Sequence, residues 1–252
     1  MPKPITIAGP DGATAEAMVH ADLAALVTGA ADFIAAEAAA AIEARGVFSI
    51  ALSGGNTPKP VYERLATLPL DWRRVHIFFG DERCVPPDDP RSNYHMVRTT
   101  LIDRVAIPPG NVHRMRGEDD PDAAAAAYAE EMKTGLGGDG RFDLVLLGLG
   151  DDGHTASLFP GLAAVSEMER TALACYVESV GMWRLTITPP AINAARRVAF
   201  LVAGAEKAGM IRRVLQGPRE PVVLPSQSVR PHDRPALWLV DAAAAAKLEP
   251  RG

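Results

Sequence analysis

Residues 148–161, GLGDDGHTASLFPG, place two aspartates and a histidine in a glycine-rich turn. His154 suits general-base chemistry, because an imidazole pKa of about 6.5 leaves much of it neutral at pH 7. Asp152, two residues earlier, can orient the ring or stabilise its charged form. Metal binding is a competing use of these residue types, but no second histidine stands at metal-ligand spacing. A glycine turn with a capping aspartate and a surface histidine is the plainer alternative.

A second group of reactive types is GDERC, Gly80–Cys84. Asp81 and Arg83 alternate along an extended chain, so both side chains leave it on the same side. They can form a simple ion pair, or the carboxylate can handle a proton or hydroxyl while the guanidinium holds an anion. Cys84 can serve as a thiolate nucleophile, but no histidine adjoins it, and a small buried side chain is favoured.

SGGNTP, Ser53–Pro58, has the composition of an anion-binding turn. Its glycines permit positive φ, and Pro58 suits the first turn of a helix. Free amides at a helix start, beside hydroxyl groups, bind anions. The residues expected to take part are Ser53, Gly54, Gly55, Asn56 and Thr57. An ordinary strand-to-helix turn is an equal alternative. A third is a serine nucleophile elbow, since ALSGG is one residue from G-x-S-x-G, but its triad partners would have to come from other loops.

Two single cations complete the candidate residues. Arg184 lies in MWRLTITPP, and Lys207 lies at the start of the helix expected after RVAFLVAG. Taken alone, each is typical of a solvated surface charge. At the start of a helix, the Lys207 ammonium and the helix N-terminus can share one phosphate.

Apolar strands alternate with helical segments along the chain, which predicts a Rossmann-like α/β fold: a mostly parallel sheet with helices on both faces. Strands are expected at 47–52, 74–79, 142–150, 184–190, 197–204 and 236–240, helices at 15–46 (one or a pair), 59–68, 205–215 and 241–248, and a loop at 84–94. Ligands of such folds bind beyond the carboxyl ends of the strands. SGGNTP, GDER, GDDGHT and GAEK each follow a strand, so we expect them to meet at one edge.

Composition limits the remaining function classes. The 252 residues, 48% of them hydrophobic, suffice for one domain spanning 1–252. A net charge of −5 argues against nucleic acid as a partner but permits a small phosphorylated ligand. Two cysteines form no disulfide or zinc pattern.

The N-terminus carries no secretory signal, and no uncharged apolar run approaches membrane-spanning length. We expect a soluble cytoplasmic protein without a membrane partner. The sequence gives no oligomeric state.

Four segments carry a resemblance over nearly the whole chain: LSGGNTPKPVYERLA, FFGDERCVPPDDPRSNYHMVRTTLI, FDLVLLGLGDDGHTASLFPG and RLTITPPAINAARRVAFLVAGAEKAGMI. They resemble the signature segments of the 6-phosphogluconolactonases, in the glucosamine/galactosamine-6-phosphate isomerase superfamily. The resemblance implies hydrolysis of 6-phospho-D-glucono-1,5-lactone in the oxidative pentose phosphate pathway. It also implies the fold of glucosamine-6-phosphate deaminase and ribose-5-phosphate isomerase, and no metal or cofactor.

The resemblance also implies roles for particular residues. His154 matches the family's catalytic histidine and Asp81 its partner carboxylate, while Arg83, Arg184, Lys207 and the SGGNT loop match sugar-phosphate contacts. We expect His154 to take a proton from water and return it to the ring oxygen. Asp81, together with Asp152, would hold the water or the imidazole in place. Arg83 or loop amides would stabilise the oxyanion. No covalent intermediate is needed, which disfavours the Ser53 elbow.

Two other functions stay open at this point. A deaminase or isomerase acting on a sugar phosphate can use the same scaffold, although Arg83 after the Asp-Glu pair follows the lactonase pattern. A non-enzymatic sugar-phosphate sensor is the other, but such sensors usually carry a DNA-binding helical module, for which we expect no spare segment here.

Overall fold

The structure, a computed structural model, describes residues 2, 4–9, 12 and 14–249. Within these residues the main sheet has seven strands in the order β1-β2-β10-β9-β6-β3-β4. Their bounds are β1 Ile5–Ala8, β2 Thr14–His20, β3 Phe48–Leu52, β4 Val75–Phe79, β6 Leu144–Leu147, β9 Arg197–Val202 and β10 Leu237–Asp241. Every neighbouring pair is parallel except β1 with β2. The mostly parallel α/β sheet predicted from the sequence is confirmed.

A smaller antiparallel sheet has the order β5-β8-β7. It consists of β5 (Asp81–Arg83), β8 (Met182–Ile187) and β7 (Ala172–Val177). The register sets Arg83 directly opposite Arg184. This sheet therefore brings together two cations that lie a hundred positions apart in the sequence.

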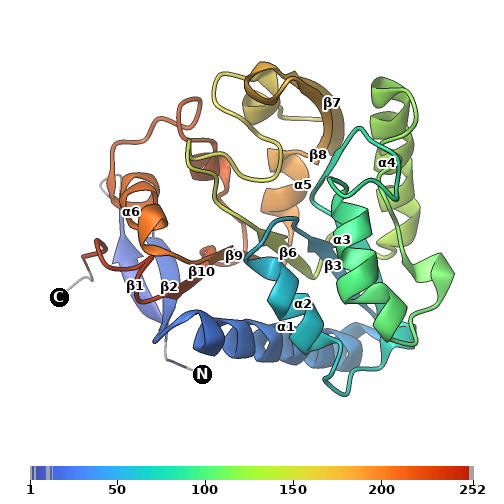
Figure 1. Cartoon of the computed structure of the whole chain (residues 1–252), viewed down its shortest axis with the longest axis horizontal. Coiled ribbons are helices and arrows are strands. Elements are labelled where there is room, and N and C mark those ends of the chain that lie inside the picture. The colour runs from blue at the N-terminus through green and yellow to red at the C-terminus, as the bar shows by residue number, and fades with distance from the viewer. Residues whose placement is uncertain (1, 3, 10–11, 13, 250–252) are drawn as a thin grey trace.

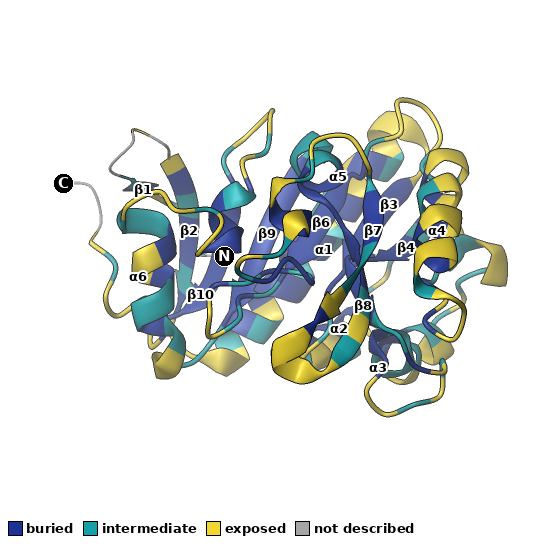
Figure 2. Ribbon diagram, turned by 90° about the horizontal axis from the view of Figure 1, so that it is seen from above, coloured by how far each residue is buried: buried dark blue, intermediate teal, exposed yellow. Residues whose placement is uncertain are grey.

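Helices cover both faces of the main sheet (Figure 1). They are α1 Leu23–Arg45, α2 Pro58–Leu65, α3 Asn93–Thr100, α4 Pro121–Gly135, α5 Pro189–Ala194 and α6 Ala208–Gln216. Helix α1 packs on α2 and against β2, β3 and β10, whereas α4 packs on β7 and β8. All residues of β3, β6, β9 and β10 are buried (Figure 2), as expected for parallel strands covered on both sides.

Helix α1 is an alanine-rich core helix. Asp22 caps its start by accepting a hydrogen bond from the amide of Ala25, and Gly46, with φ of 82°, ends it. By length and composition α1 could cross a membrane, but charged residues such as Asp32 and Glu37 interrupt it, so it is not the uncharged run whose absence was expected. Its inner side, from Leu26 to Ala41, is buried against the sheet, so in this fold α1 serves as a core element.

The ends of the chain differ from the expected elements. Residues 15–20, expected to be helical, form most of β2, because β10 and β1 supply hydrogen-bond partners on either side. Residues 242–247, also expected to be helical, form successive turns after β10. Strands β1, β5 and β7 have no counterpart in the sequence-based expectation.

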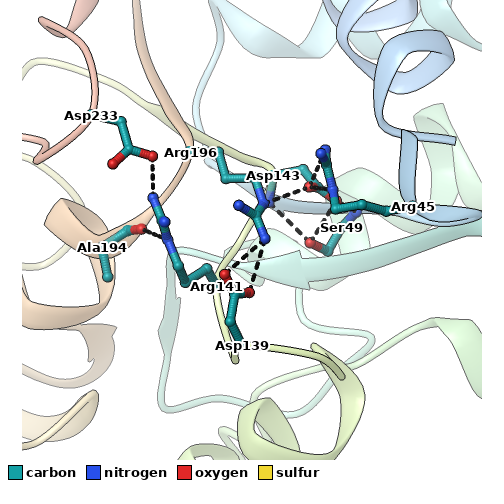
Figure 3. Close-up of polar contacts among 8 residues, drawn as sticks. All are labelled: Arg45, Ser49, Asp139, Arg141, Asp143, Ala194, Arg196 and Asp233. Atoms are coloured by element: carbon teal, nitrogen blue, oxygen red, sulfur yellow. Dashed lines mark hydrogen bonds and ion pairs between the residues drawn. The ribbon is translucent and has the colours of Figure 1, made fainter. Parts of the chain in front are cut away.

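Asp143 joins three strands at their amino ends (Figure 3). Its carboxylate accepts hydrogen bonds from the amide and hydroxyl of Ser49 and pairs with Arg45 at 2.7 Å and Arg196 at 3.4 Å. Ser49 lies on β3, Asp143 directly precedes β6, and Arg196 directly precedes β9. This network fixes the strand register at the edge opposite the carboxyl ends.

The chain reverses its direction of winding between β3 and β6. From β3 it moves outward to β4, whereas from β6 it continues toward β9 on the other side. Neighbouring strands whose connections leave in opposite directions open a crevice beyond their carboxyl ends. The fold therefore predicts a ligand site between the loop after Leu52 and the loop after Leu147.

A second polar cluster joins His76 of β4 to His113 and to Glu131 of α4, away from that crevice. The Nδ1 atom of His76 lies 3.0 Å from Nε2 of His113, whose Nδ1 lies 2.5 Å from a carboxylate oxygen of Glu131. His113 also stacks on Phe78, with ring centroids 4.2 Å apart. Burial, followed by the neighbouring His113, lowers the pKa of His76.

We expect this pKa shift to make the fold less stable in mild acid. Below the unfolded-state pKa of about 6.5, the unfolded chain binds a proton at His76 more readily than the folded chain does. The free energy of unfolding therefore falls as pH drops through 6.5 toward the folded pKa, by at most about 1.4 kcal/mol per pH unit. Urea unfolding at pH 7.5 and 5.5 should show a smaller pH difference for His76→Gln than for wild type. An equal difference would contradict this account.

Candidate active site

A cavity of about 470 Å³ lies in the predicted crevice. It is lined by the ends of β3, β6 and β9 and by β5, so the four polar segments that follow strands do meet there, as expected. Of the eleven predicted site residues, all except Asp152 line it: Ser53, Gly54, Gly55, Asn56, Thr57, Asp81, Arg83, His154, Arg184 and Lys207.

The His154 ring is held on two sides. Its Nδ1 lies 2.6 Å from Oδ1 of Asp152, which also accepts a hydrogen bond from the His154 amide. The ring stacks on Phe159, with centroids 4.0 Å apart. Because Nδ1 faces a carboxylate, it carries the proton in the neutral ring, and Nε2 keeps its lone pair. Asp152 therefore lies behind the imidazole while His154 itself lines the cavity.

The turn that carries His154 requires glycine at position 150. A Cβ atom on Gly150 would lie 2.0 Å from Nδ1 of His154. Any larger residue would push the ring out of its contact with Asp152. The glycines of this turn thus allow the close approach of backbone and imidazole.

Asp81 is buried at the cavity wall, with 8% of its surface exposed. Its Oδ2 accepts a hydrogen bond of 2.7 Å from the Ser157 hydroxyl, and its Oδ1 accepts one of 3.1 Å from the Asn93 amide. The carboxylate that contacts the His154 ring is Asp152, not Asp81. The structure therefore gives the two aspartates separate positions.

Asn93 joins the other groups of the site, and sequence reasoning gave it no role. Its Nδ2 donates to the carbonyl and carboxylate of Asp81, and its Oδ1 accepts a 2.7 Å hydrogen bond from Arg83. A Cβ atom on Gly54 would lie 1.8 Å from that Oδ1. Asn93 thus links the carboxylate, the guanidinium and the SGGNTP loop. Its only sequence signal was its place in FFGDERCVPPDDPRSNYHMVRTTLI, one of the segments that carry the family resemblance.

Glu82 supports the same wall from beneath. It is 2% exposed and accepts hydrogen bonds from the Ser92 hydroxyl and from the amides of Arg83, Asn93 and Tyr94. Burial raises the pKa of Glu82, and these donors oppose that effect. The carboxylate lies at the start of α3, where the unpaired amides favour a negative charge.

Buried tyrosines fix the ends of two strands at the cavity. The Tyr62 hydroxyl bonds to both the amide and the carbonyl of Ser53, at 3.1 and 2.8 Å. Tyr128 makes the same pair of bonds to Phe79, at 2.8 and 2.9 Å. Both phenols are fully buried, and this burial raises their pKa values. The strand ends are therefore rigid supports for the loops that follow them.

Three polar atoms in the cavity wall are buried without a partner among the described residues. They are the Ser53 hydroxyl and the Nε atoms of Arg83 and Arg184. Burial lowers the pKa of Arg184; the Asp81 charge opposes this effect, and the neighbouring Arg83 charge adds to it. Leaving such donors unpaired costs about 1–3 kcal/mol each, and more for charged groups. An anionic ligand would satisfy them.

The loop after β3 offers further donors to the same ligand. Within the described chain, the amides of Gly54, Gly55 and Asn56 donate to no other backbone or side-chain group. Gly55 has φ of 106°, a conformation that favours glycine. Free amides beside the N-terminus of α2 form an anion-binding turn.

Lys207 faces the cavity while bound to the loop that carries His154. Its Nζ donates to the Leu149 carbonyl at 2.9 Å and pairs with Asp151 at 2.5 Å. The Lys207 hydrogen bond lowers the pKa of Asp151. This cation therefore has protein partners that a ligand phosphate would have to share.

Other chemistries find less support in the described residues. No group of three or more His, Cys, Asp or Glu side chains there could hold a metal ion. Burial raises the pKa values of both Cys84 and Cys175 to about 11, which leaves the thiols protonated and poorly nucleophilic. The Ser53 hydroxyl has no histidine partner within the part of the chain that is described. The geometry thus gives the serine elbow no base.

Comparison with known proteins agrees with this geometry. Residues 21–238 match the family model described as glucosamine-6-phosphate isomerases/6-phosphogluconolactonase. A 6-phosphogluconolactonase of Nostoc is 44% identical over 90% of this chain and 95% of its own length. One of Streptomyces coelicolor is 36% identical over 93% and 95%. The 6-phosphogluconolactonase structure from Thermotoga maritima superposes with a TM-score of 0.80 at 31% identity, over 89% of this chain and 98% of that one. The chain therefore belongs to the family of glucosamine-6-phosphate isomerases and 6-phosphogluconolactonases.

Proposed function

We propose that the protein hydrolyses 6-phospho-D-glucono-1,5-lactone to 6-phosphogluconate, the second step of the oxidative pentose phosphate pathway. The observation that carries this proposal is one cavity that holds both a histidine with a free Nε2 and two arginines with unpartnered donors. The histidine can activate a water molecule for attack on a carbonyl, and the arginines can bind the phosphate of a sugar phosphate. The relatives named 6-phosphogluconolactonase support the same reaction.

In this mechanism, Nε2 of His154 accepts a proton from water as the water oxygen bonds to the lactone carbonyl carbon. The tetrahedral oxyanion then collapses, the bond from that carbon to the ring oxygen breaks, and His154 returns the proton to the ring oxygen. General acid–base catalysis of this kind contributes about 10²–10⁴-fold in rate. Asp152, 2.6 Å from Nδ1, stabilises the imidazolium between the two transfers.

The other side chains position the reacting groups. Asp81, held by Ser157 and Asn93, is proposed to orient the attacking water. Arg83 or the loop amides are proposed to stabilise the oxyanion, where one donor is worth about 3 kcal/mol. The substrate phosphate, with a charge of about −1.5 to −2, is proposed to bind the SGGNT loop, Arg184 and Lys207.

The second candidate function is a sugar-phosphate deaminase or isomerase, because the family description names isomerases as well as lactonases. The deciding experiment follows the lifetime of 6-phosphogluconolactone, generated in situ, with and without the protein. Because the lactone also hydrolyses unaided, the protein-free rate is subtracted. Rapid loss of lactone with no ammonia released from glucosamine 6-phosphate supports the lactonase. The reverse result establishes the deaminase.

Replacing Arg184 by glutamine should raise KM about 10- to 150-fold with little change in kcat. A charge-assisted hydrogen bond to the phosphate is worth about 1.5–3 kcal/mol, and it is made equally in the ground and transition states. Lys207→Ala should raise KM by no more than about fivefold, because Asp151 and the Leu149 carbonyl already share its ammonium. Steady-state kinetics with a fall in kcat and an unchanged KM would remove Arg184 from the binding role.

The proposed location is the cytoplasm, and the proposed partner is the small lactone alone. Helix α1 is apolar enough to span a membrane, but its buried side packs into the core of the protein, and this packing supports the proposed location. Both statements depend on the lactonase assignment.

A further inference from the structure

A second cavity, of about 310 Å³, lies apart from the first and shares none of its lining residues. It opens beneath the C-terminal turn of α6, beside the first residues of β2 and β10. Its inner wall is apolar and includes Val214, Val229 and the stacked rings of Phe200 and Trp238, whose centroids are 4.0 Å apart. Such a wall suits an apolar or ring-shaped group.

Cationic side chains gather at the mouth of this cavity, where Arg219 and Arg230 also interact with other groups of the protein. Arg219, Arg230 and Arg234 line it with His232, and all four are exposed. Among its described lining residues, Asp233 is the single acidic one, and Arg141 pairs with it (Figure 3). The chain as a whole carries a net charge of −5, so this concentration of cations runs against its composition.

The segment that carries these cations is held in a fixed conformation. Asn193 of α5 donates to the Ser228 carbonyl at 2.9 Å, and it accepts hydrogen bonds from the amides of Arg230 and His232 at 2.6 and 3.0 Å. Arg197 donates to the Pro235 carbonyl at 3.1 Å. The backbone of the rim is thus ordered before any ligand arrives, which reduces the entropy lost on binding.

We propose that this cavity binds a small organic phosphate, with its apolar body against the inner wall and its phosphate at the arginines. Apolar walls with a few convergent polar groups characterise small-molecule sites, and 310 Å³ falls at the small end of their range. Arginine pairs well with phosphate because its donors match the oxygens in geometry and charge.

A ligand here would touch a segment that supports the His154 turn. Ser226 lines the second cavity, and both its amide and its hydroxyl donate to the Gly153 carbonyl, at 3.0 and 2.9 Å. Leu224 occupies the space beside Gly153, where a Cβ atom would lie 2.8 Å from its Cδ2. Ser226 of the second cavity thus contacts Gly153, the residue directly before His154. The proposal that this cavity binds a ligand does not depend on the proposed function.

Phenyl phosphate tests the proposal, because it joins a ring to a dianion. Isothermal titration calorimetry of the full chain should show one site that binds phenyl phosphate at least tenfold more tightly than phenol or inorganic phosphate. The double variant Arg230→Gln/Arg234→Gln should weaken this binding at least tenfold. Arg212→Gln, an exposed arginine of α6 outside the cavity, should leave it unchanged.

The two cavities are told apart by Arg184→Gln, which alters only the first. Binding of phenyl phosphate that survives in Arg184→Gln and is lost in the double variant supports the second cavity. Binding lost in Arg184→Gln but kept in the double variant places the ligand in the first cavity and overturns the proposal. Absence of binding to wild type overturns it as well, whether or not the protein hydrolyses the lactone.

Discussion

Replacing His154 by alanine is expected to lower kcat about 10²–10⁴-fold while KM changes by less than about threefold. The variant keeps the arginines and the loop after β3, so the phosphate still has its donors. It loses the nitrogen that takes the proton from water and returns it to the ring oxygen. The measurement is lactone consumption at saturating substrate, with the protein-free rate subtracted.

His76→Gln is the matched control for that experiment. It removes an equally sized ring that lies on β4, outside the lactone cavity, and should leave kcat unchanged at pH 7.5. A rise in KM with an undiminished kcat in His154→Ala would make the imidazole a binding group. The proton transfers proposed here would then need another base.

Changing Asn93 to aspartate is expected to lower kcat/KM about 10²–10³-fold at neutral pH and to move the acid limb of its pH profile upward. The side chain keeps its size, but a donor 3.1 Å from Asp81 becomes a second carboxylate. Two carboxylates at this distance repel, which raises the pKa of the pair, and like-charge contacts of this kind cost several kcal/mol. Arg83 keeps an acceptor, so its own position changes little.

Asn111→Asp provides the comparison for Asn93. The Asn111 amide donates to the carbonyls of Arg73 and Val75 in a turn away from the lactone cavity, so its replacement should change kcat/KM by less than about twofold. If Asn93→Asp loses activity without any shift of the pH profile, Asn93 serves the fold rather than the protonation state of Asp81.

Much of the site could be predicted because its residues directly follow strands. Once a parallel sheet is expected, the segments after Leu52, Phe79 and Leu147 must emerge at one edge, so Ser53, Asp81 and His154 could be assigned to one place. Asn93 and Ser157 could not be assigned to the site in this way. Their roles depend on the side-chain positions of α3 and of the turn after His154, which no local pattern encodes.

The pairing of Arg83 with Arg184 was also beyond the sequence. Each cation was noticed separately, but their contact depends on the register of β5 against β8, across a hundred positions. Short antiparallel strands such as β5 carry too few residues to show a period. Only the structure shows that the Nε atoms of Arg83 and Arg184 lack partners among the described residues and lie in the same wall of the lactone cavity.

The fold was misjudged where alanine dominates. Alanine favours a helix by intrinsic propensity, yet residues 15–20 form β2 because pairing with β1 and β10 outweighs that preference. The buried residues of TAEAMVH are Ala15, Ala17, Met18 and His20, and because Ala17 and Met18 adjoin, the segment shows no strict alternation that would have marked it as a strand. After Asp241, successive turns form although the segment DAAAAAK has the composition of a helix.

The position of β10 bears on how the protein is made. This strand comes last along the chain but lies inside the sheet, paired with β2 on one side and β9 on the other. Until residues 237–241 have been synthesised, β2 and β9 present open edges, which invite aggregation. Contacts that span almost the whole chain also slow folding. The sheet therefore stays incomplete until β10 has been synthesised. We expect chaperones to be needed to cover the open strand edges during translation.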